Sequence, residues 1–593
     1  MYIIGISAFY HDSSISIIKD GEILFAAQEE RYTRIKNDSS FPELALQAGL
    51  GYLKILPHQV DAIVFYEKPF LKFERILETY LNYAPRGFLS FLKSMPPWIK
   101  EKLFQKKIIA KKLIQMKFSK DIINRIYFSD HHLSHAASAF YPSPFQKALV
   151  LTMDGVGEWP TTTVYTGVDS ELKKIKEIHF PHSLGLLYSA FTYYCGFKVN
   201  SGEYKLMGLA PFGQPKYSDL IKKELIDIKS DGSFHLNMKY FDYCTGLKMT
   251  NKQFDNLFGK SFRRPTEPIL QIHMDIAASI QLVLEEIIIK ICKSLKSDYP
   301  EYTALVLAGG VALNCVVNGK IEQEKIFEHL WIQPASGDAG GSLGAALAFY
   351  YNELKNNRVA NSDDQMNGSY LGNDYSNLEI KNFLTEIGAS FHFFPNEKSA
   401  ELLNLVCHEL CDEKAVGWFQ GRMEFGPRAL GNRSILASPV PRDMQKKLNI
   451  KIKFRESFRP FAPAILEEEA WHWYNIKTTS SYMLKTATIN KNYQNHVPAV
   501  THVDQTARLQ TVNKKTNLIF HRLISEFYKK SQIPMLVNTS FNIRGEPIVE
   551  SPQDAFRCFM GTHLDVLVMN SFLLYKDEQP SHLKSDYRES IED

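Results

Sequence analysis

The chain has 593 residues, of which 45% are hydrophobic, 12% aromatic and 23% charged. These proportions are typical of a folded globular protein and exclude the disordered, collagen-like and coiled-coil classes. At about 150 residues per domain, the length predicts about two to four domains. The net charge of +4 does not by itself indicate a nucleic-acid partner. No apolar run reaches the roughly 18 residues of a membrane span, and the N-terminus soon turns polar, so we expect a cytoplasmic protein without a transmembrane segment.

Short strands are predicted at the start of the chain. Residues 1–28 contain three strand-like runs, and the last two are joined by Asp20-Gly21, a strong hairpin signal. A short amphipathic helix at 43–54 precedes a strand at 61–65. Further along, the pattern predicts strands at 125–128, 147–153, 162–165 and 304–307, a long helix at 269–295, and a Gly-rich loop entering a helix within 337–351. This alternation indicates an α/β fold.

One segment of the chain is strongly basic. From Lys68 to Lys120, 13 Lys or Arg residues stand against three Glu, so the local charge is 13 − 3 = +10, and apolar and aromatic side chains lie between them. Such a surface could grip nucleic acid, lie against an anionic membrane leaflet, or receive an acidic or lipid-linked acceptor. A solvated helical hairpin is the simplest interpretation. Composition leaves these alternatives open.

A polar stretch divides the chain. Residues 352–373 are rich in Asn, Asp, Ser and Gly and lack apolar periodicity, which is typical of a linker. We therefore expect a first domain at 1–355 with a basic insertion at 68–120, a linker at 356–373, a second domain at 374–580 and a polar tail at 581–593. The second domain is predicted to alternate helices and strands, with helices at 377–388 and 400–411 and strands at 415–419, 535–537 and 566–569.

Two histidines and two aspartates have the character of metal ligands. His131 and His135 lie four residues apart, on one face of a predicted helix. Asp154 ends an apolar strand at a Gly turn, and Asp338 lies in a Gly-rich loop before a helix. Mixed nitrogen and oxygen ligands suit iron, manganese or zinc. The alternative is that the histidines cap a helix or bond within the core, because His pairs at this spacing also occur by chance.

Gly-rich segments flank predicted regular elements at 307–314 and 336–342. Glycines let backbone N–H groups approach an anion, so both loops suit phosphate or adenine-ribose contacts. Neither matches a Walker A or Rossmann fingerprint, and a tight turn explains each one equally well.

The densest group of cationic residues is in the second domain. Residues 421–460 contain ten Lys or Arg residues against three acidic ones, set among Gly, Pro and Phe. Guanidinium groups in such a setting bind planar anions, phosphate or carboxylate, through paired hydrogen bonds. Arg508, Asn538 and Thr539 add further donors. We expect an anion-binding pocket here, and RNA phosphate is the competing anion.

These segments together resemble one protein family along most of the chain. The resemblance rests on AQEERYTRIKND, HHLSHAASAFYPSPF, TMDGVGE, GEYKLMGLAPFG, LAGGVALN, SGDAGGSLGAA, GRMEFGPRALGNRSI, FRESFRPFAP and VNTSFNIRGEPIVESPQDA. In this order they resemble the NodU and antibiotic O-carbamoyltransferase family, which includes tobramycin and cephalosporin carbamoyltransferases.

The resemblance implies an α/β protein whose two domains have different roles. The N-terminal domain looks like the actin-like, sugar-kinase-like ATPase fold, and the C-terminal domain looks like a YrdC-like domain. In such enzymes the second domain joins carbamoyl phosphate to ATP, giving carbamoyl adenylate and pyrophosphate. The first domain then transfers the carbamoyl group to a hydroxyl of a natural product or sugar and releases AMP. The implied cofactors are ATP, magnesium with the ATP, and one divalent metal, with iron favoured.

The resemblance also implies site residues. The family's metal ligands fall on His131, His135, Asp154 and Asp338. The residues matched to the carbamoyl adenylate site of the first domain are His11, Lys36, Gly309, Gly310 and Asn314. The residues matched to carbamoyl phosphate and ATP in the second domain are Arg428, Arg459, Arg508, Asn538 and Thr539. His11 and Lys36 are the catalytic candidates, with His11 as general base because a histidine pKa lies near neutrality; a turn histidine bonding to backbone is the alternative.

Two other functions compete with this interpretation. A tRNA-modifying carbamoyl transferase of the threonylcarbamoyladenosine type would use related domains and the basic insertion. A non-catalytic, actin-like ATP-binding regulator would keep the Gly-rich loops but would not need the arginines of the second domain. We expect a small hydroxylated acceptor and no nucleic-acid partner.

Overall fold

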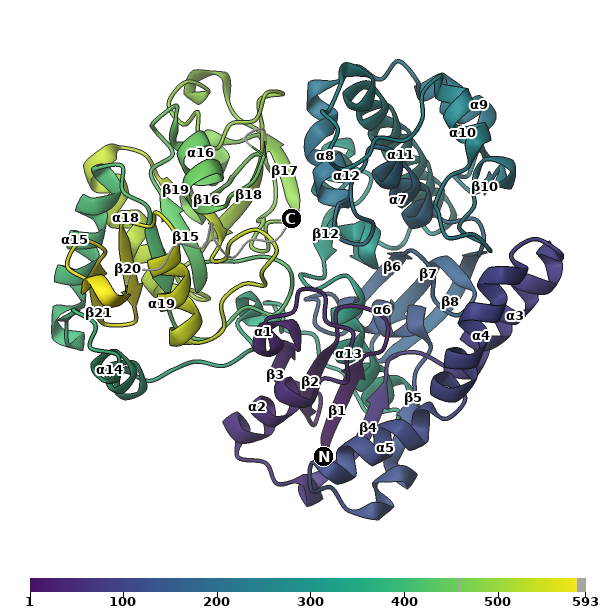
Figure 1. Cartoon of the computed structure of the whole chain (residues 1–593), viewed down its shortest axis with the longest axis horizontal. Coiled ribbons are helices and arrows are strands. Elements are labelled where there is room, and N and C mark those ends of the chain that lie inside the picture. The colour runs from purple at the N-terminus through teal and green to yellow at the C-terminus, as the bar shows by residue number, and fades with distance from the viewer. Residues whose placement is uncertain (457–458, 584–593) are drawn as a thin grey trace. The chain divides into compact units, whose positions relative to one another are not determined.

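The computed structural model describes residues 1–456 and 459–583, and the chain divides into two compact units (Figure 1). The first unit comprises Met1–Leu24, Ser40–Glu43 and Leu53–Gln365. The second unit comprises Phe25–Ser39, Leu44–Tyr52 and the chain from Met366 onward. Of the polar tail expected at 581–593, residues 584–593 lie outside the described residues.

The first sheet of the first unit has the strand order β3-β2-β1-β4-β5. Its strands are β1 (Tyr2–Ser7), β2 (Ser14–Lys19), β3 (Glu22–Gln28), β4 (Val60–Phe65) and β5 (Ile126–Phe128). Strand β1 pairs with β2 antiparallel and with β4 parallel, and β4 pairs with β5 parallel. The hairpin predicted at Asp20-Gly21 is confirmed: both residues have positive φ, 50° and 86°, which suits the turn of a tight hairpin.

The second sheet repeats this topology. Its order is β12-β11-β6-β7-β8, with β6 (Lys147–Met153), β7 (Pro160–Val168), β8 (Glu171–His179), β11 (Ala304–Ala308) and β12 (His329–Ile332). Strands β6, β7 and β8 form an antiparallel meander, and β11 and β12 join β6 as parallel strands. The duplication agrees with the actin-like, sugar-kinase-like fold that the resemblance implies, and the α/β fold class is confirmed.

Two short helices pack tightly between the sheets. Helix α6 (His131–Phe140) contacts α13 (Asp338–Leu347), and α13 also packs on β1 and β2. Glycines allow this approach: a Cβ at Gly344 would overlap the backbone oxygen of Ser134, and one at Gly5 would overlap that of Ser342. The small residues of α13 therefore set the position of its first residue.

Other helices cover the first unit. The long helix predicted at 269–295 is confirmed as α11 (Gln271–Asp298). The remaining elements are α7 (Leu184–Tyr194), α8 (Glu203–Leu209), α9 (Ser218–Glu224), α10 (Lys252–Phe258), α12 (Cys315–Glu324), β9 (Ile226–Ile228) and β10 (Phe234–Leu236).

The basic insertion folds as α3 (Pro69–Tyr83), α4 (Phe88–Lys102) and α5 (Gln105–Gln115). It differs from a solvated hairpin, because Lys72, Arg75 and Thr79 on α3 are each at most 7% exposed. The guanidinium of Arg75 donates to the carbonyl of Gly157 at 2.8 Å. One face of α3 is thus part of the interior of the first unit.

The second unit is built on a mixed sheet with the order β13-β21-β20-β14-β15-β19-β16-β18-β17. Its strands are β13 (His392–Phe393), β14 (Val416–Phe419), β15 (Arg433–Ala437), β16 (Ala462–Leu466), β17 (Lys485–Thr488), β18 (Thr506–Val512), β19 (Met535–Ser540), β20 (Val566–Met569) and β21 (Phe572–Tyr575). Its helices are α14 (Asn377–Glu386), α15 (Ser399–Cys411), α16 (Met444–Lys447), α17 (Ala470–Trp473), α18 (Leu518–Ser531) and α19 (Pro552–Gly561). The predicted α/β alternation is confirmed.

An early part of the chain packs with the second unit. Helix α1 (Glu30–Thr33) and most of α2 (Glu43–Leu53) belong to it. Arg31 is 1% exposed and donates to the carbonyl of Gly426, and Arg34 donates to the carbonyls of Pro547 and Ile548. The domain boundary predicted from the sequence placed these residues in the first domain, whereas their contacts place Phe25–Ser39 and Leu44–Tyr52 in the second unit.

The segment expected to be a linker, 356–373, is largely packed. Arg358 is 4% exposed, and its guanidinium donates to the carbonyls of Phe140, Ser143 and Phe145. The contacts assign residues up to Gln365 to the first unit and those from Met366 to the second. Polar composition alone did not reveal this, because a buried arginine satisfied by backbone carbonyls is as polar as a solvated one.

Within residues 1–456 and 459–583, no helix is both long enough and apolar enough to cross a membrane.

The contact between α6 and α13 predicts a stability effect. We expect Gly344→Ala to lower the free energy of unfolding by about 1–3 kcal/mol or more, because the added methyl group has no space. In the control, Gly51→Ala, the methyl group meets no atom within 4 Å on helix α2, and we expect a neutral or slightly stabilising effect. Urea unfolding followed by circular dichroism measures both, and equal stability of Gly344→Ala and wild type would contradict the packing argument.

Candidate functional site

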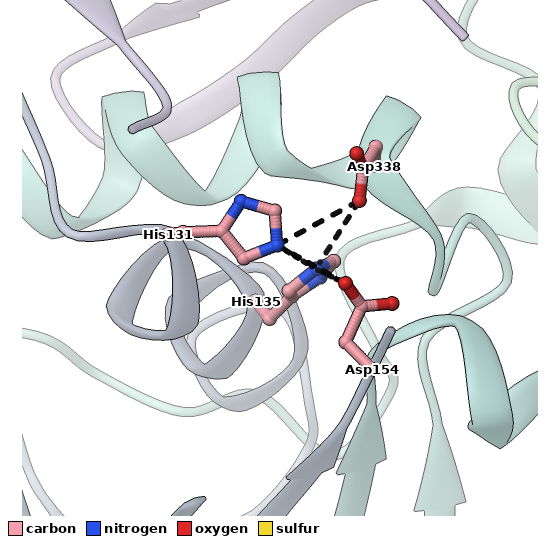
Figure 2. Close-up of side chains that lie close together, drawn as sticks. All are labelled: His131, His135, Asp154 and Asp338. Atoms are coloured by element: carbon pink, nitrogen blue, oxygen red, sulfur yellow. Dashed lines mark hydrogen bonds and ion pairs between the residues drawn. The ribbon is translucent and has the colours of Figure 1, made fainter. Parts of the chain in front are cut away.

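Four predicted ligand residues of the first unit converge on one point (Figure 2). We call His131, His135, Asp154 and Asp338 the His/Asp cluster; one ligand atom from each lies within 4.8 Å of the other three. The Nε2 atom of His131 lies 3.1 Å from Nε2 of His135 and 3.2 Å from Oδ2 of Asp154. Oδ1 of Asp338 lies 3.7 Å from Nε2 of His131 and 3.6 Å from Nε2 of His135.

Local structure explains the convergence. His131 and His135 lie one helical turn apart on α6, so their rings point in the same direction. Asp154 directly follows β6, and its Oδ1 accepts a hydrogen bond from the backbone N–H of Gly310 at 2.9 Å, which turns Oδ2 toward the histidines. Asp338 is the first residue of α13.

The cluster concentrates charge in a buried volume. Burial raises the pKa of the Asp338 carboxyl, but His11 and His135 outweigh this effect and lower it to about 2. Burial likewise lowers the pKa of His135, but Asp154 and Asp338 outweigh it and raise the value to about 9. Two carboxylates therefore face two imidazoles whose Nε2 atoms lie 3.1 Å apart.

The donor set fits a divalent cation. Two imidazole nitrogens and two carboxylate oxygens form the mixed set that iron, manganese and zinc accept. The Nδ1 atoms of His131 and His135 are buried and have no hydrogen-bond partner among the described residues, so the rings are directed toward the cluster through Nε2 alone.

The middle histidine of the motif has a different role. Nδ1 of His132 lies 2.8 Å from the hydroxyl of Thr152 and 3.1 Å from that of Thr163. Burial lowers the pKa of His132 well below its usual value. It is a neutral core histidine, which the sequence motif could not distinguish from its neighbours.

His11 lies beside the cluster. Its Nε2 is 3.6 Å from Oδ2 of Asp338, and its Nδ1 is 3.0 Å from Oδ2 of Asp12. Its side chain is 24% exposed, so it can reach solvent. Burial lowers the pKa of His11, but Asp338 and Asp12 outweigh it and raise the value to about 9.

The loop at 309–314 is also tied to the cluster. Gly309 has φ of 86°, and a Cβ there would overlap the backbone of Met153. The N–H of Gly310 is occupied by Asp154. The side chain of Asn314 caps α12 and exchanges hydrogen bonds with Gln281. In this loop the structure supports a role in orienting Asp154; nucleotide binding by Gly309, Gly310 and Asn314 stays a prediction.

The predicted residues of the second unit lie on two strands and the loops beside them. Asn538 and Thr539 are on β19, and Arg508 is on β18. Asn538 donates to the side chain of Gln510 on β18 and to the carbonyl of Ala429, which connects these strands to the loop that carries Arg428.

The arginines of the second unit do not all have the same role. Arg433 is fully buried and donates to the carbonyls of Gln420 and Gly421. Arg422 donates to the carbonyls of residues 371 and 372. Arg428, Arg459 and Arg508, like Arg422, are half-buried, so they retain access to solvent.

Lys453 is a further buried cation that motif reasoning did not single out. Its amino group donates to Ser540, the last residue of β19, and to Asn542 just after that strand. Burial, Arg455, Arg459 and Lys36 together lower its pKa well below the usual value. Lys36, expected with the nucleotide residues of the first domain, therefore lies in the second unit near this lysine.

Comparison with known proteins identifies the family. Residues 2–347 match the model of the carbamoyltransferase N-terminus, and residues 407–576 match that of the carbamoyltransferase C-terminus. The chain belongs to the carbamoyltransferase family. It is a carbamoyltransferase enzyme, as the resemblance to NodU-type proteins predicted.

Several relatives match the carbamoyltransferase along most of its length. The uncharacterized protein sll1178 of Synechocystis sp. is 50% identical, with 98% of this chain and 97% of that protein covered. The nodulation protein NolNO of Sinorhizobium fredii is 34% identical, with 96% and 80% covered, and nodulation protein U of the same species is 27% identical, with 93% and 95% covered. Among solved structures, component A of (R)-2-hydroxyglutaryl-CoA dehydratase from Acidaminococcus fermentans matches 60% of this chain and 99% of its own, with a TM-score of 0.32 and 15% identity.

The His/Asp cluster predicts bound metal. We expect purified enzyme to carry close to one divalent ion per chain, and His135→Ala to lose most of it, because three remaining ligands bind a metal far more weakly. In the control, His132→Ala removes a neighbouring imidazole that faces two threonines, and the metal should remain. Elemental analysis after gel filtration measures both, and active enzyme without metal would contradict the assignment.

Proposed function

We propose that the chain is an ATP-dependent O-carbamoyltransferase with two half-reactions. In the first, carbamoyl phosphate, ATP and one water react in the second unit to give carbamoyl adenylate, pyrophosphate and orthophosphate. In the second, the first unit transfers the carbamoyl group to a hydroxyl of a natural product or sugar, and AMP leaves. The observation that carries the proposal is the convergence of the His/Asp cluster beside His11 in a chain of the carbamoyltransferase family.

In the first unit, the His/Asp cluster would hold the divalent metal. The metal would supply Lewis-acid polarisation of the carbamoyl carbonyl. The N–H of Gly310 orients the carboxylate of Asp154, and the turn of α6 orients both imidazoles.

His11 is the proposed general base for the acceptor hydroxyl. It is partly exposed beside the cluster, and Asp12 contacts Nδ1, which leaves Nε2 as the nitrogen that receives the proton. Asp338 raises the pKa of His11 only while its own charge is not compensated. A cation held by the cluster would offset the charge of Asp338, and this would lower the pKa of His11 toward the neutral range in which a base is effective.

In the second unit, cationic side chains would bind the phosphates. Carbamoyl phosphate and ATP, which comes with magnesium, bring several negative charges together. Arg428, Arg459 and Arg508 supply positive charge, and Asn538 and Thr539 supply neutral hydrogen-bonding groups. We propose that Lys36 contributes to this group of cations.

The proposal predicts a defined product. We expect the enzyme, given ATP, magnesium, isotope-labelled carbamoyl phosphate and a panel of hydroxylated acceptors, to add one labelled carbamoyl group to at least one acceptor. The label should appear only when ATP is present, and AMP and pyrophosphate should form in equal amounts. Mass spectrometry detects the product; label transfer without ATP would contradict the adenylate route.

The first half-reaction should depend on Arg459. We expect Arg459→Ala to lose about 2–4 kcal/mol of transition-state stabilisation, because a charged contact to phosphate is removed, and to retain transfer from supplied carbamoyl adenylate. Arg442→Ala is the matched control, since Arg442 is an exposed arginine of the same region. Pyrophosphate release measures the effect, and a wild-type rate in Arg459→Ala would refute the assignment.

The second half-reaction should depend on His11. We expect His11→Asn to consume ATP and carbamoyl phosphate but to carbamoylate no acceptor, because asparagine keeps some hydrogen bonding and cannot accept the proton. Pyrophosphate release and acceptor mass are measured on the same sample. If His11→Asn and Arg459→Ala each fail in both half-reactions, a single shared site is indicated and the two-step proposal is wrong.

A further inference from the structure

A buried glutamate lies behind the His/Asp cluster. Glu67, two residues after the end of β4, is 0% exposed. Its Oε2 accepts a hydrogen bond from the amino group of Lys72 at 2.6 Å and lies 4.0 Å from Nδ1 of His131. Neither Glu67 nor Lys72 belongs to the cluster or to the predicted catalytic residues.

Burying the ion pair of Glu67 and Lys72 costs free energy. Taking a carboxylate and an ammonium group out of water costs several kcal/mol per ion, and their attraction often only balances that cost. Lys72 is 4% exposed and lies over the ring of Tyr10 at 4.6 Å, next to His11 in the sequence. Burial lowers the pKa of Lys72, but Glu67 outweighs this effect and raises it, so Lys72 is charged.

The geometry of His131 indicates a role for this buried pair. Its Nε2 faces the cluster, so Nδ1 carries the proton when Nε2 binds a cation, and a ligating imidazole usually donates that proton to a carboxylate or carbonyl. Nδ1 is buried and has no hydrogen-bond partner in the described part of the chain. The carboxylate of Glu67 faces this nitrogen.

A second buried glutamate touches the same histidine differently. Glu158, 4% exposed, accepts hydrogen bonds from the backbone N–H of His131 at 3.0 and 3.1 Å and from that of Lys68 at 2.8 Å. It therefore holds the start of α6, and Glu67 is the carboxylate on the ring side. The two glutamates provide a matched comparison.

We propose that Glu67 is a positioning residue of the metal centre, whose carboxylate accepts the Nδ1 proton of His131 and is itself held by Lys72 from helix α3. The inference rests on the metal centre of the proposed function. The separation of 4.0 Å exceeds a hydrogen bond, so the ring and the carboxylate would have to approach each other by about 1 Å for this hydrogen bond to form. The first helix of the basic insertion thereby acts on the metal centre through Lys72 and Glu67.

Cobalt binding to the full-length protein tests the proposal. Protein freed of metal is titrated with Co²⁺ in competition with a chelator, and the d–d absorption of the bound ion reports both affinity and ligand field. We expect Glu67→Gln to bind Co²⁺ about 10–100-fold more weakly and with an altered spectrum, because the amide is a weaker acceptor for the Nδ1 proton. Glu158→Gln should stay within about threefold of wild type, since it leaves the ring side unchanged.

The outcomes separate the possible failures. Wild-type affinity in Glu67→Gln, or an equal loss in both variants, overturns the positioning role. Absence of Co²⁺ binding by wild type instead contradicts the metal centre itself. Thermal unfolding of the metal-free proteins shows whether each variant folds. If Glu67→Gln does not fold, Glu67→Asp is decisive: it keeps the carboxylate and should bind within about tenfold of wild type, and a larger loss with an unchanged spectrum overturns the proposal.

Discussion

The arrangement of the first unit depends on one constraint, which is the burial of two carboxylates against two imidazoles. Asp338 is 2% exposed and each histidine of the cluster at most 2%. Ionised groups taken out of water need compensation from opposite charge and directed hydrogen bonds. Here part of it comes from within the chain, through the N–H of Gly310 and through His11. Under the proposed function, a divalent cation held by the cluster would compensate the two carboxylates further.

The duplicated sheet places these groups together. His11 and Asp12 lie in the turn after β1, the first strand of one sheet, and Asp154 follows β6, the first strand of the other. The two copies thus contribute polar side chains from equivalent turns. Helices α6 and α13 provide the other residues of the cluster, and they can do so only because Gly344 lets them approach closely. Packing between small residues therefore determines the electrostatics of the cluster.

Residues with strong local signals were predictable from the sequence. The spacing of His131 and His135 and the position of Asp154 after an apolar strand contain most of the information about the cluster. The turn at Asp20-Gly21 follows from backbone preference alone. These features depend on a few neighbouring residues, so a single sequence reveals them.

Features that depend on distant contacts were not predictable. Arg358 sits in a polar stretch typical of a linker, yet carbonyls more than 200 residues earlier satisfy its guanidinium. Lys36 was grouped by motif with the first domain, but the contacts of residues 25–39 place it in the second unit. Lys72 is one of 13 cations of a segment with the composition of a solvated surface, and only its pairing with Glu67 distinguishes it. Composition and periodicity contain no information about such pairs.

The central claim is that the His/Asp cluster is the metal centre of carbamoyl transfer. Anomalous X-ray scattering from crystals of active enzyme, recorded on both sides of the absorption edge of the metal it contains, tests this most directly. The account predicts one strong peak in the first unit, about 2.0–2.3 Å from Nε2 of both histidines and from one oxygen of each aspartate. A peak bound by other residues, with these four side chains paired only with one another, would contradict it.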